Sequence, residues 1–497
     1  MAVVAVASSC CPPRAAQTVP PTPAAAATPP PAAPAVSADA WTASGVDWSR
    51  PPAAGAEPAF TPPVPVAFDV AGARVLLVEN HRLPLVSIRV LFGRAGARED
   101  GVHPGLAALT ADLLDEGAGR FDAMTLPEEV ERLGATLRVA VGADIARVSL
   151  DTLRDTLEPS LGLLADVIVR PRLTRADFER VRGDRLATLA LRPDQPDEVA
   201  GLVFERQIFG AHPYAAPTTG FPATLRAIRL SEVRTFWKSR YRAGDATIII
   251  VGDIDRATVE KPLAAAFAGW AAGTAPAPRI PPPPAPQQPV LTVVDRPGAP
   301  QSVVQIGRVG PAAGDDPAYF PLEVANTALG GSFLSRLNGR LREELGYTYG
   351  VGSSFWRGRW GGSWTIQTSL RTASTVAGIR EALAIVDGTR KTELPAAELD
   401  KTLQMMTRAA PRTFETNAGI ASAFEDLVTE GLPLDWHQGW IPKVRAVTAA
   451  RAREAADAAW GDLSIVVVGD WTALKAGLAE LGLPIAHADA EGNPVKL

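Results

Sequence analysis

The sequence is poor in the side chains that form disulfides and bind zinc. It has two cysteines among 497 residues, Cys10 and Cys11, which are adjacent and so cannot staple distant segments or form a Cys-rich metal site. The five histidines are spread along the chain: His81, His103, His212, His437 and His487. No two of them have the spacing that places both on one helix face. A zinc site built from paired histidines on one helix is therefore excluded.

Excess positive charge and long apolar runs are also absent. The formal net charge is −5, and the Lys and Arg residues are scattered rather than gathered along one helix. Such a chain offers no basic surface to a polyanion, so nucleic acid is not expected as a partner. No run of 18 apolar residues occurs after the first residues of the chain, which excludes a later membrane-spanning helix.

The first residues, MAVVAVASSCC, are small and apolar and lead to a cysteine. This pattern resembles the end of a bacterial lipoprotein export signal, with Cys10 as the lipidation candidate. It predicts a periplasmic or outer-membrane-anchored lipoprotein. The segment lacks a basic start and its apolar part is short, so an unfolded tail without an export function is the alternative.

Proline-rich stretches divide the chain. Residues 12–66 are rich in Pro and Ala, a composition that cannot bury enough apolar surface to fold. A second stretch, APAPRIPPPPAPQQP at 275–289, separates two segments of similar length. The expected organisation is a leader and disordered tether (1–66), a first repeat (67–270), a linker (271–290), a second repeat (291–480) and a C-terminal tail (481–497).

The two long segments resemble each other. Each ends in a β-branched run followed by Gly-Asp, ATIIIVGD at 246–253 and LSIVVVGD at 463–470, and each run follows a helix-like segment, 231–241 and 448–460. The order of elements predicts an α+β fold of two homologous α/β sandwich repeats, with helices packed on a mostly antiparallel sheet. Chance similarity between buried strands is the alternative explanation.

Three helices can be placed from their end signals. Leucines at helical spacing and Gly117 predict a helix over 106–116. Thr174 with Asp177 resembles a capping box that starts a helix running to about residue 191. A third helix is expected to end near Leu345, where Gly346 supplies a left-handed cap before a strand with the sequence YTYGVGSSF.

Several motifs occur in the order that is typical of one family. They are LGATLRVAVGADIARVSL at 133–150, AHPYAAPTTGFPATLRAI at 211–228 and GGSFLSRLNGRLREELGYTYGVGSSF at 330–355. Together they resemble the insulinase/pitrilysin-like zinc metallopeptidases (inverzincins), and within them the two-repeat branch related to the mitochondrial processing peptidase. The resemblance extends over residues 64–475. It implies two repeats of the LuxS/mitochondrial-processing-peptidase-like fold.

The resemblance also implies where a zinc site would lie, and that this chain has lost it. Active members carry His-x-x-Glu-His on a first-half helix, with two zinc ligands and a general base. The matching segment, GLAALTADLLDEG at 105–117, has Ala108 and Asp112 at the histidine positions and Ala111 at the base. The later glutamate ligand matches LATL at 186–189, with Thr188. No zinc is expected on this chain.

Two carboxylates near these positions leave one alternative open. Asp112 and Asp184 would make an oxygen-only site, which is weak because zinc sites in proteins normally include nitrogen or sulfur ligands. The simpler interpretation is that both lie on solvated helix faces. His103, which precedes Pro104, is better explained as a loop residue than as a ligand.

The family's substrate-binding pair is retained. By resemblance these residues are Arg342 and Tyr349, whose guanidinium and hydroxyl groups would hold peptide and stabilise a developing oxyanion. Tyr347 would lie on the same strand face as Tyr349, so the choice between the two tyrosines stays open. The structural alternative is that Arg342 is a surface residue and the tyrosines pack a hairpin.

The family includes heterodimers in which one subunit bears zinc and the other completes the site. The first hypothesis is therefore a non-catalytic, substrate-binding subunit that pairs with a zinc-bearing paralogous peptidase and acts on peptide substrates. The second is a binding or scaffold protein with no proteolytic role. The third, an autonomous peptidase with an atypical site, requires stoichiometric zinc on the isolated chain.

Overall fold

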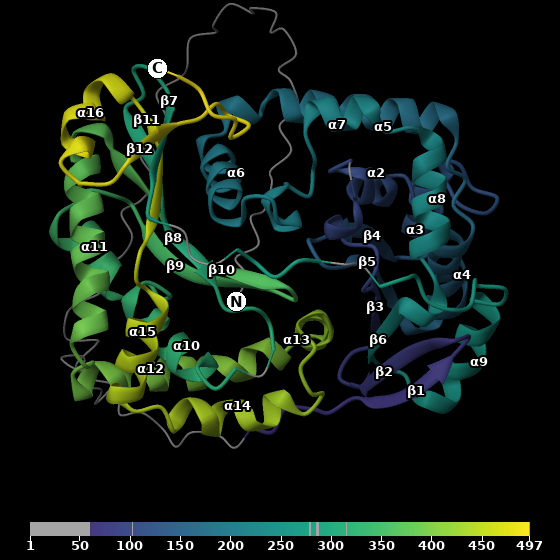
Figure 1. Cartoon of the computed structure of the whole chain (residues 1–497). Coiled ribbons are helices and arrows are strands. Elements are labelled where there is room, and N and C mark those ends of the chain that lie inside the picture. The colour runs from purple at the N-terminus through teal and green to yellow at the C-terminus, as the bar shows by residue number, and fades with distance from the viewer. Residues whose placement is uncertain (1–59, 102, 278–279, 285–287, 315, 497) are drawn as a thin grey trace, which may run out of the picture. The chain divides into compact units, whose positions relative to one another are not determined.

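A computed structural model describes residues 60–101, 103–277, 280–284, 288–314 and 316–496. The expected lipidation site Cys10 and nearly all of the Pro/Ala-rich tether lie outside the described residues, so both stay predictions. The described part of the chain holds two six-stranded sheets, one from each half (Figure 1). No helix among the described residues is long and apolar enough to cross a membrane.

The two sheets share the order of five of their six strands. The first sheet is ordered β1-β2-β6-β3-β5-β4 and the second β12-β7-β11-β8-β10-β9. The strands of the first are β1 (Val66–Val70), β2 (Ala73–Glu79), β3 (Leu85–Phe92), β4 (Thr136–Val141), β5 (Ala146–Leu153) and β6 (Ala246–Gly252). Those of the second are β7 (Leu291–Asp295), β8 (Gln301–Gly310), β9 (Val351–Gly358), β10 (Gly361–Arg371), β11 (Ser464–Gly469) and β12 (Ile485–His487).

Strand directions repeat as well. In both sheets one central pair is parallel, β2 with β6 and β7 with β11, and the next three pairings are antiparallel. The sheets differ only at one edge, where β1 runs antiparallel to β2 and β12 runs parallel to β7. Two homologous repeats with mostly antiparallel sheets and packed helices are therefore confirmed. The segment after residue 480, expected to be a tail, instead contributes β12 to the second sheet.

Each sheet buries one face against helices of its own half. The first half contributes α2 (Leu106–Asp112), α3 (Thr125–Arg132), α4 (Leu157–Val169), α5 (Arg175–Ala190), α7 (Pro222–Ala227), α8 (Leu230–Arg240) and α9 (Arg256–Ala266). The second half contributes α10 (Tyr319–Leu329), α11 (Thr375–Lys391), α12 (Ala396–Ala409), α14 (Trp436–Arg445), α15 (Ala449–Ala459) and α16 (Trp471–Ala479). Alternation along β2 shows why both faces need cover: Val75 and Leu77 join the first core, and Leu76 joins the core of the second half.

The opposite face of each sheet is covered by a helix from the other half. Helix α6 (Pro196–Phe209) packs on β8 and β11, where its Val203 and Phe204 share a core with Val303 and Val466. Helix α13 (Asn417–Glu430) packs reciprocally on β3 and β6 (Figure 1). Since α6 and α13 hold the same place in the two repeats, the exchange is symmetric, and neither half completes its core alone.

A buried polar cluster also joins the two halves. Asp144, which is 4% exposed, accepts hydrogen bonds from Arg98 Nη1 (2.5 Å), Tyr214 Oη (2.7 Å) and the Arg359 backbone N–H (2.7 Å). Arg359 lies in the tight turn between β9 and β10. A buried carboxylate is stable only when it is paired and hydrogen-bonded, and here the partners come from both repeats.

Three helix ends were expected from sequence, and the structure corrects one of them. Thr174 caps α5 by accepting from the Asp177 N–H at 3.2 Å, and the helix ends at Ala190, as expected. Gly346 adopts φ +60°, also as expected. The helix expected over 106–116 is shorter: it stops at Asp112, with Leu113 as its C-cap, and Gly117 lies beyond it at φ +115°.

The helix exchange predicts that one core residue of α6 stabilises both halves. Phe204 is 1% exposed, and its ring lies against the backbone of β8 at Gly307. Phe204→Ala should lower the free energy of unfolding by about 3–5 kcal/mol, because it leaves a cavity between the two halves. Denaturant unfolding measures this. Leu191→Ala, at a side chain that is 61% exposed, should change it by about 0.5 kcal/mol or less. A Phe204→Ala effect no larger than that of Leu191→Ala would contradict the exchange.

Candidate functional site

The helix at the expected metal-binding position, α2, is held by a buried carboxylate. Asp100 Oδ2 accepts from the Gly105 N–H and Asp100 Oδ1 from the Ala107 N–H, both at 2.6 Å. These donors belong to the first turn of α2, whose amides have no partner within the helix. Burial raises the pKa of Asp100 to about 7, although the backbone N–H groups act in the opposite direction. Asp100 was not singled out from the sequence.

The three motif positions of α2 share a face but carry no metal-binding set. Ala108 and Ala111 are buried, at 5% and 2% exposure, and offer neither lone pair nor proton acceptor. Asp112 Oδ2 accepts from Arg185 of α5, from Nε at 2.9 Å and also from Nη2. The side chain of Arg185 is 16% exposed and that of Asp112 is 38% exposed. A guanidinium therefore lies on the helix face where the family would hold a cation.

The other residues considered near this site point elsewhere. Thr188 is exposed, and its hydroxyl donates to the Asp184 carbonyl within α5. The Asp184 side chain is 72% exposed and pairs with Arg180 at 3.4 Å. His103 lies 3.3 Å from Glu232 of α8, in keeping with a loop residue. None of these side chains contacts Asp112, so an oxygen-only site from Asp112 and Asp184 is not assembled.

The residues on this face do not fit zinc. Zinc requires three or four nitrogen, sulfur or carboxylate donors, and Asp112 is one donor already neutralised by Arg185. Across the described residues, no group of three or more His, Cys, Asp and Glu side chains is close enough to hold a metal ion. The Arg185 guanidinium would also repel a divalent cation at this position.

The second-half motif contains a π-helix, Asn338–Glu344, that carries Arg342. π-Helices are rare in proteins, and those that occur often lie at functional sites. Asn338 anchors the π-helix to the sheet, because its amide donates to the Val351 carbonyl at 2.8 Å and accepts from the Val351 N–H at 3.1 Å. The intervening residues 345–350 therefore form a loop with fixed ends.

Arg342 is partly exposed, and one of its guanidinium nitrogens is buried without a hydrogen-bond partner among the described residues. Its guanidinium lies 4.3 Å from the ring centroid of Phe333, which is 65% exposed. Nη1 is 3.1 Å from Glu343 Oε1 but makes no aligned hydrogen bond among the described residues. No hydrogen bond or cation–π contact there joins Arg342 to Tyr349, so the structure does not bring the pair into direct contact.

The structure distinguishes the two tyrosines. The expected strand begins only at Val351, so the expectation that Tyr347 and Tyr349 share a strand face is wrong: both lie in the loop. Gly346, in the left-handed region, turns the chain out of the π-helix before a strand can form. Tyr347 packs against the second core, whereas Tyr349 is 95% exposed.

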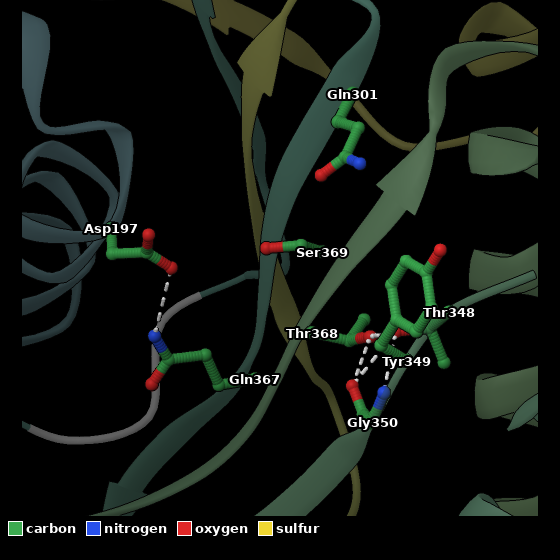
Figure 2. A pocket seen from close by; sticks show the side chains of 8 residues that line it. All are labelled: Asp197, Gln301, Thr348, Tyr349, Gly350, Gln367, Thr368 and Ser369. Carbon is green, nitrogen blue, oxygen red and sulfur yellow. Dashed lines mark hydrogen bonds between the residues drawn. The ribbon is translucent and has the colours of Figure 1, made fainter. Parts of the chain in front are cut away.

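Local hydrogen bonds hold Tyr349 in this exposed position. Thr348 Oγ1 lies 3.1 Å from the Gly350 N–H nitrogen and 2.8 Å from the Gly350 carbonyl. Thr368 Oγ1, on β10, lies 3.0 Å from both Thr348 Oγ1 and the Gly350 carbonyl (Figure 2). The residues on either side of Tyr349 are thus pinned to the sheet, and the ring has no packing partner in the core.

A pocket of about 270 Å³ lies beside Tyr349. Most of its lining residues have polar side chains, and they come from both halves: Asp197, Gln301, Thr348, Tyr349, Gly350, Gln367, Thr368 and Ser369. Figure 2 shows Asp197 and Gln367 at one side of the pocket and Tyr349 at the other. The sequence did not indicate Asp197 or Gln367, because they meet only when α6 crosses to the second sheet.

Arg185 was also missed, although a signal was present. It lies three residues before Thr188 and so on the same side of α5 as the expected glutamate position. An arginine there, opposite an aspartate at a histidine position of α2, is a complementary pair. At the positions of the family's His-x-x-Glu-His motif this chain has Ala108, Ala111 and Asp112. With Arg185 nearby, this pattern can be interpreted as an ion pair in place of a metal site.

The fold and these sites define a peptidase-type fold without a metal centre among its described residues. Residues 227–406 match the family described as the peptidase M16 inactive domain. Within these residues the chain is similar to a peptidase M16 inactive domain, and the resemblance to insulinase-like zinc peptidases is confirmed.

Relatives and solved structures agree with this assignment. A protein of Helicobacter pylori named non-peptidase homolog YmxG is 23% identical over 384 residues, which cover 75% of this chain and 86% of the relative. An uncharacterized zinc protease of Mycobacterium leprae is 27% identical over 64% of this chain and 73% of its own length. The crystal structure of a peptidase M16 inactive domain from Pseudomonas fluorescens has a TM-score of 0.77 at 27% identity, covering 82% of this chain and 98% of that one. All three matches support a peptidase-type fold, and the names of the Helicobacter pylori and Pseudomonas fluorescens proteins support an inactive one.

The ion pair between α2 and α5 predicts a measurable contribution to stability. Arg185→Met should lower the free energy of unfolding by about 1–2 kcal/mol, a value between those of exposed and buried pairs, because it leaves Asp112 without a partner. Arg175→Met is the control on the same helix, since Arg175 is exposed and has no ion pair among the described residues, and should cost about 0.5 kcal/mol or less. If both substitutions lowered the free energy of unfolding equally in denaturant experiments, the Asp112–Arg185 pair would make no specific contribution to stability.

Asp100 predicts a pH dependence of stability. Its pKa is about 7 in the folded protein and about 3.9 in an unfolded chain, so the folded state binds the extra proton. The stabilising contribution is complete below pH ~4 and is lost as pH rises through 7. Between pH 4.5 and 7.5 this proton makes the free energy of unfolding fall by up to about 1.4 kcal/mol per pH unit, and Asp100→Asn should remove that part of the slope. Asp184→Asn, at an exposed carboxylate, should leave the slope unchanged; an unchanged slope in Asp100→Asn would refute the assignment.

Proposed function

We propose that this chain is the zinc-less, substrate-binding subunit of a two-subunit zinc metallopeptidase. In this proposal a homologous partner with an intact His-x-x-Glu-His helix binds the zinc ion, and this chain contributes Arg342 and Tyr349 to the shared peptide site. The substrates are peptides, and hydrolysis takes place only in the assembled pair.

The observation that carries the proposal is the exposure of Tyr349. A tyrosine that is 95% exposed loses the hydrophobic free energy of burial, yet the turn that bears it is tied to β10 through Thr348 and Thr368. An exposed ring on an ordered turn adds little to stability but is well placed to contact a ligand. The neighbouring Tyr347, which packs against the core, shows that the loop is able to bury an aromatic residue.

The chemistry of the pair suits a peptide carbonyl. The Arg342 guanidinium and the Tyr349 hydroxyl are hydrogen-bond donors, and donors aimed at a carbonyl oxygen stabilise negative charge as it develops there. The first half supplies neither a general base nor a metal ligand. Ala111 cannot accept a proton from water, and Asp112 is paired with Arg185. A partner therefore has to supply the metal and the base.

A scaffold role without proteolysis is the second candidate. Stacking on Phe333 and the contact with Glu343 give Arg342 local partners, which a purely structural role would also require. The relative from Helicobacter pylori carries the name of a non-peptidase homologue. Under this alternative, substitutions at Arg342 and Tyr349 leave the activity of any zinc-bearing partner unchanged.

Co-purification with a zinc-bearing homologue from the same organism tests the proposal. The pair should hydrolyse unfolded peptides faster than the partner alone. In the pair, Arg342→Ala or Tyr349→Phe in this chain should lower kcat/KM by about 100-fold, the effect of removing one oxyanion-hole donor. Peptide-cleavage kinetics measures this, with zinc content and complex formation monitored for each variant.

Tyr347→Phe is the matched control, because it removes a hydroxyl from the same loop but not from the exposed ring. It should leave kcat/KM within about twofold. The proposal fails if the pair is no more active than the partner alone, or if Arg342→Ala and Tyr349→Phe behave like Tyr347→Phe.

A further inference from the structure

A second pocket, of about 190 Å³, lies where helix α13 meets the first sheet. Its lining residues include Arg94, Asp245 and Thr247 from the first half, and Arg359 and Val428 from the second. Residues paired directly across a sheet lie on one face, and Thr247 is paired with Leu91, a residue of the second core. The pocket therefore lies on the sheet face that α13 covers, and groups from both repeats meet in it.

Arg359, in the turn between β9 and β10, is held at this pocket by α13. Its Nε donates to the Thr429 carbonyl at 3.3 Å and its Nη2 to the Val428 carbonyl at 3.2 Å. These carbonyls belong to the last turn of α13, where no amide of the helix reaches them. Arg359 Nη1 makes no hydrogen bond among the residues that the structure describes, and a Cβ at Gly93, another lining residue, would lie 3.6 Å from it. The guanidinium is thus fixed with one nitrogen left for a ligand.

Positive charge exceeds negative charge around this pocket. Three arginines share the Glu99 carboxylate at distances of 3.2–3.6 Å: Arg94, Arg98 and Arg240. Arg98 has a second carboxylate partner, Asp144, but within the described chain no carboxylate oxygen lies within 4.0 Å of the Arg359 guanidinium. Burial lowers the pKa of Arg359, and the charge of Arg98 lowers it further. An unpaired guanidinium in a partly buried position is unfavourable, and an anion in the pocket relieves that cost.

The pocket also contains an acceptor, which restricts the anion that fits. Asp245 Oδ2 accepts from the Ala275 N–H at 2.5 Å, and no Lys, Arg or His nitrogen of the described residues lies within 4.0 Å of this carboxylate. A carboxylate repels an anion unless the anion has a proton to donate. Phosphate keeps a hydroxyl proton near neutral pH, whereas sulfate keeps none. The lining therefore favours hydrogen phosphate over sulfate.

We propose that this pocket binds a hydrogen phosphate group. Arg359 Nη1, Arg94 Nη1 and the Thr247 hydroxyl donate to the phosphate oxygens, and the phosphate hydroxyl donates to Asp245. The bound group joins β6 of the first half to Arg359 and α13 of the second. This site shares no lining residue with the pocket beside Tyr349, so it is tested independently of the proposed function.

Structural roles explain part of these contacts. A cation at a helix C-terminus is favourable, so Arg359 caps α13 with or without a ligand. Arg94 Nη2 likewise donates to the Pro276 carbonyl. Neither role uses the Thr247 hydroxyl, which makes no hydrogen bond within the described chain. Thr247→Val therefore removes a proposed ligand contact without removing a hydrogen bond between described residues.

Equilibrium dialysis of the full chain against radiolabelled inorganic phosphate tests the site, in chloride buffer of constant ionic strength near neutral pH. Phosphate should bind saturably and about tenfold more tightly than sulfate, measured by competition. Arg359→Gln and Thr247→Val should each weaken phosphate binding about tenfold, because each removes a donor to a charged group. Asp245→Asn keeps an oxygen for the Ala275 N–H and should abolish the preference over sulfate. Arg138→Met, at an exposed cation on β4 outside the pocket, should leave binding unchanged.

No saturable binding, equal affinity of the unmodified chain for phosphate and sulfate, or equal losses in Thr247→Val and Arg138→Met would each refute the assignment. Circular dichroism verifies the fold of every variant. If Arg359→Gln loosens α13, Thr247→Val decides the question. Competition by glycerol phosphate identifies the source of the group: competition equal to that of inorganic phosphate assigns the pocket to phosphate monoesters, and no competition assigns it to the free ion.

Discussion

The exchange of α6 and α13 is the packing constraint on which the rest of the structure depends. Each sheet has a second apolar face that its own half leaves uncovered, and the helix that covers it comes from the other repeat. The exchange fixes the halves as one folding unit. It also places Asp197, a first-half residue, beside the Tyr349 turn of the second half. Both the fold and the candidate peptide site thus follow from one packing requirement.

Helices α2 and α5 have no metal ligands at the motif positions, so another interaction has to join them there. In a zinc peptidase of this type, the ion would link the residues of α2 and α5. Here the same two helices are linked by Asp112 and Arg185. Beside this ion pair, Ala108 and Ala111 are buried and offer no group that could bind a metal ion. This is why an inactive repeat can remain well folded.

Much of the fold could be predicted from the sequence because its signals are local or repeated. The Gly-Asp ends of the two strands and the Thr174 cap each depend on a few neighbouring residues, and the structure contains both features. The strand assigned to Tyr347 and Tyr349 was wrong because the π-helix and the Gly346 turn depend on the Asn338 anchor to Val351. Arg185 left a signal in its spacing from Thr188, whereas Asp197 meets the second sheet only through contacts distant in sequence, which residue patterns do not reveal without the fold.

The central claim is that the Tyr349 turn faces the zinc-binding helix of a partner subunit. A photo-reactive phenylalanine analogue at position 349 tests this most directly in the purified complex, with cross-linked peptides identified by mass spectrometry. The account predicts cross-links to the partner's His-x-x-Glu-His helix or the residues that flank it. Cross-links confined to this chain, or to a partner surface away from that helix, would contradict it.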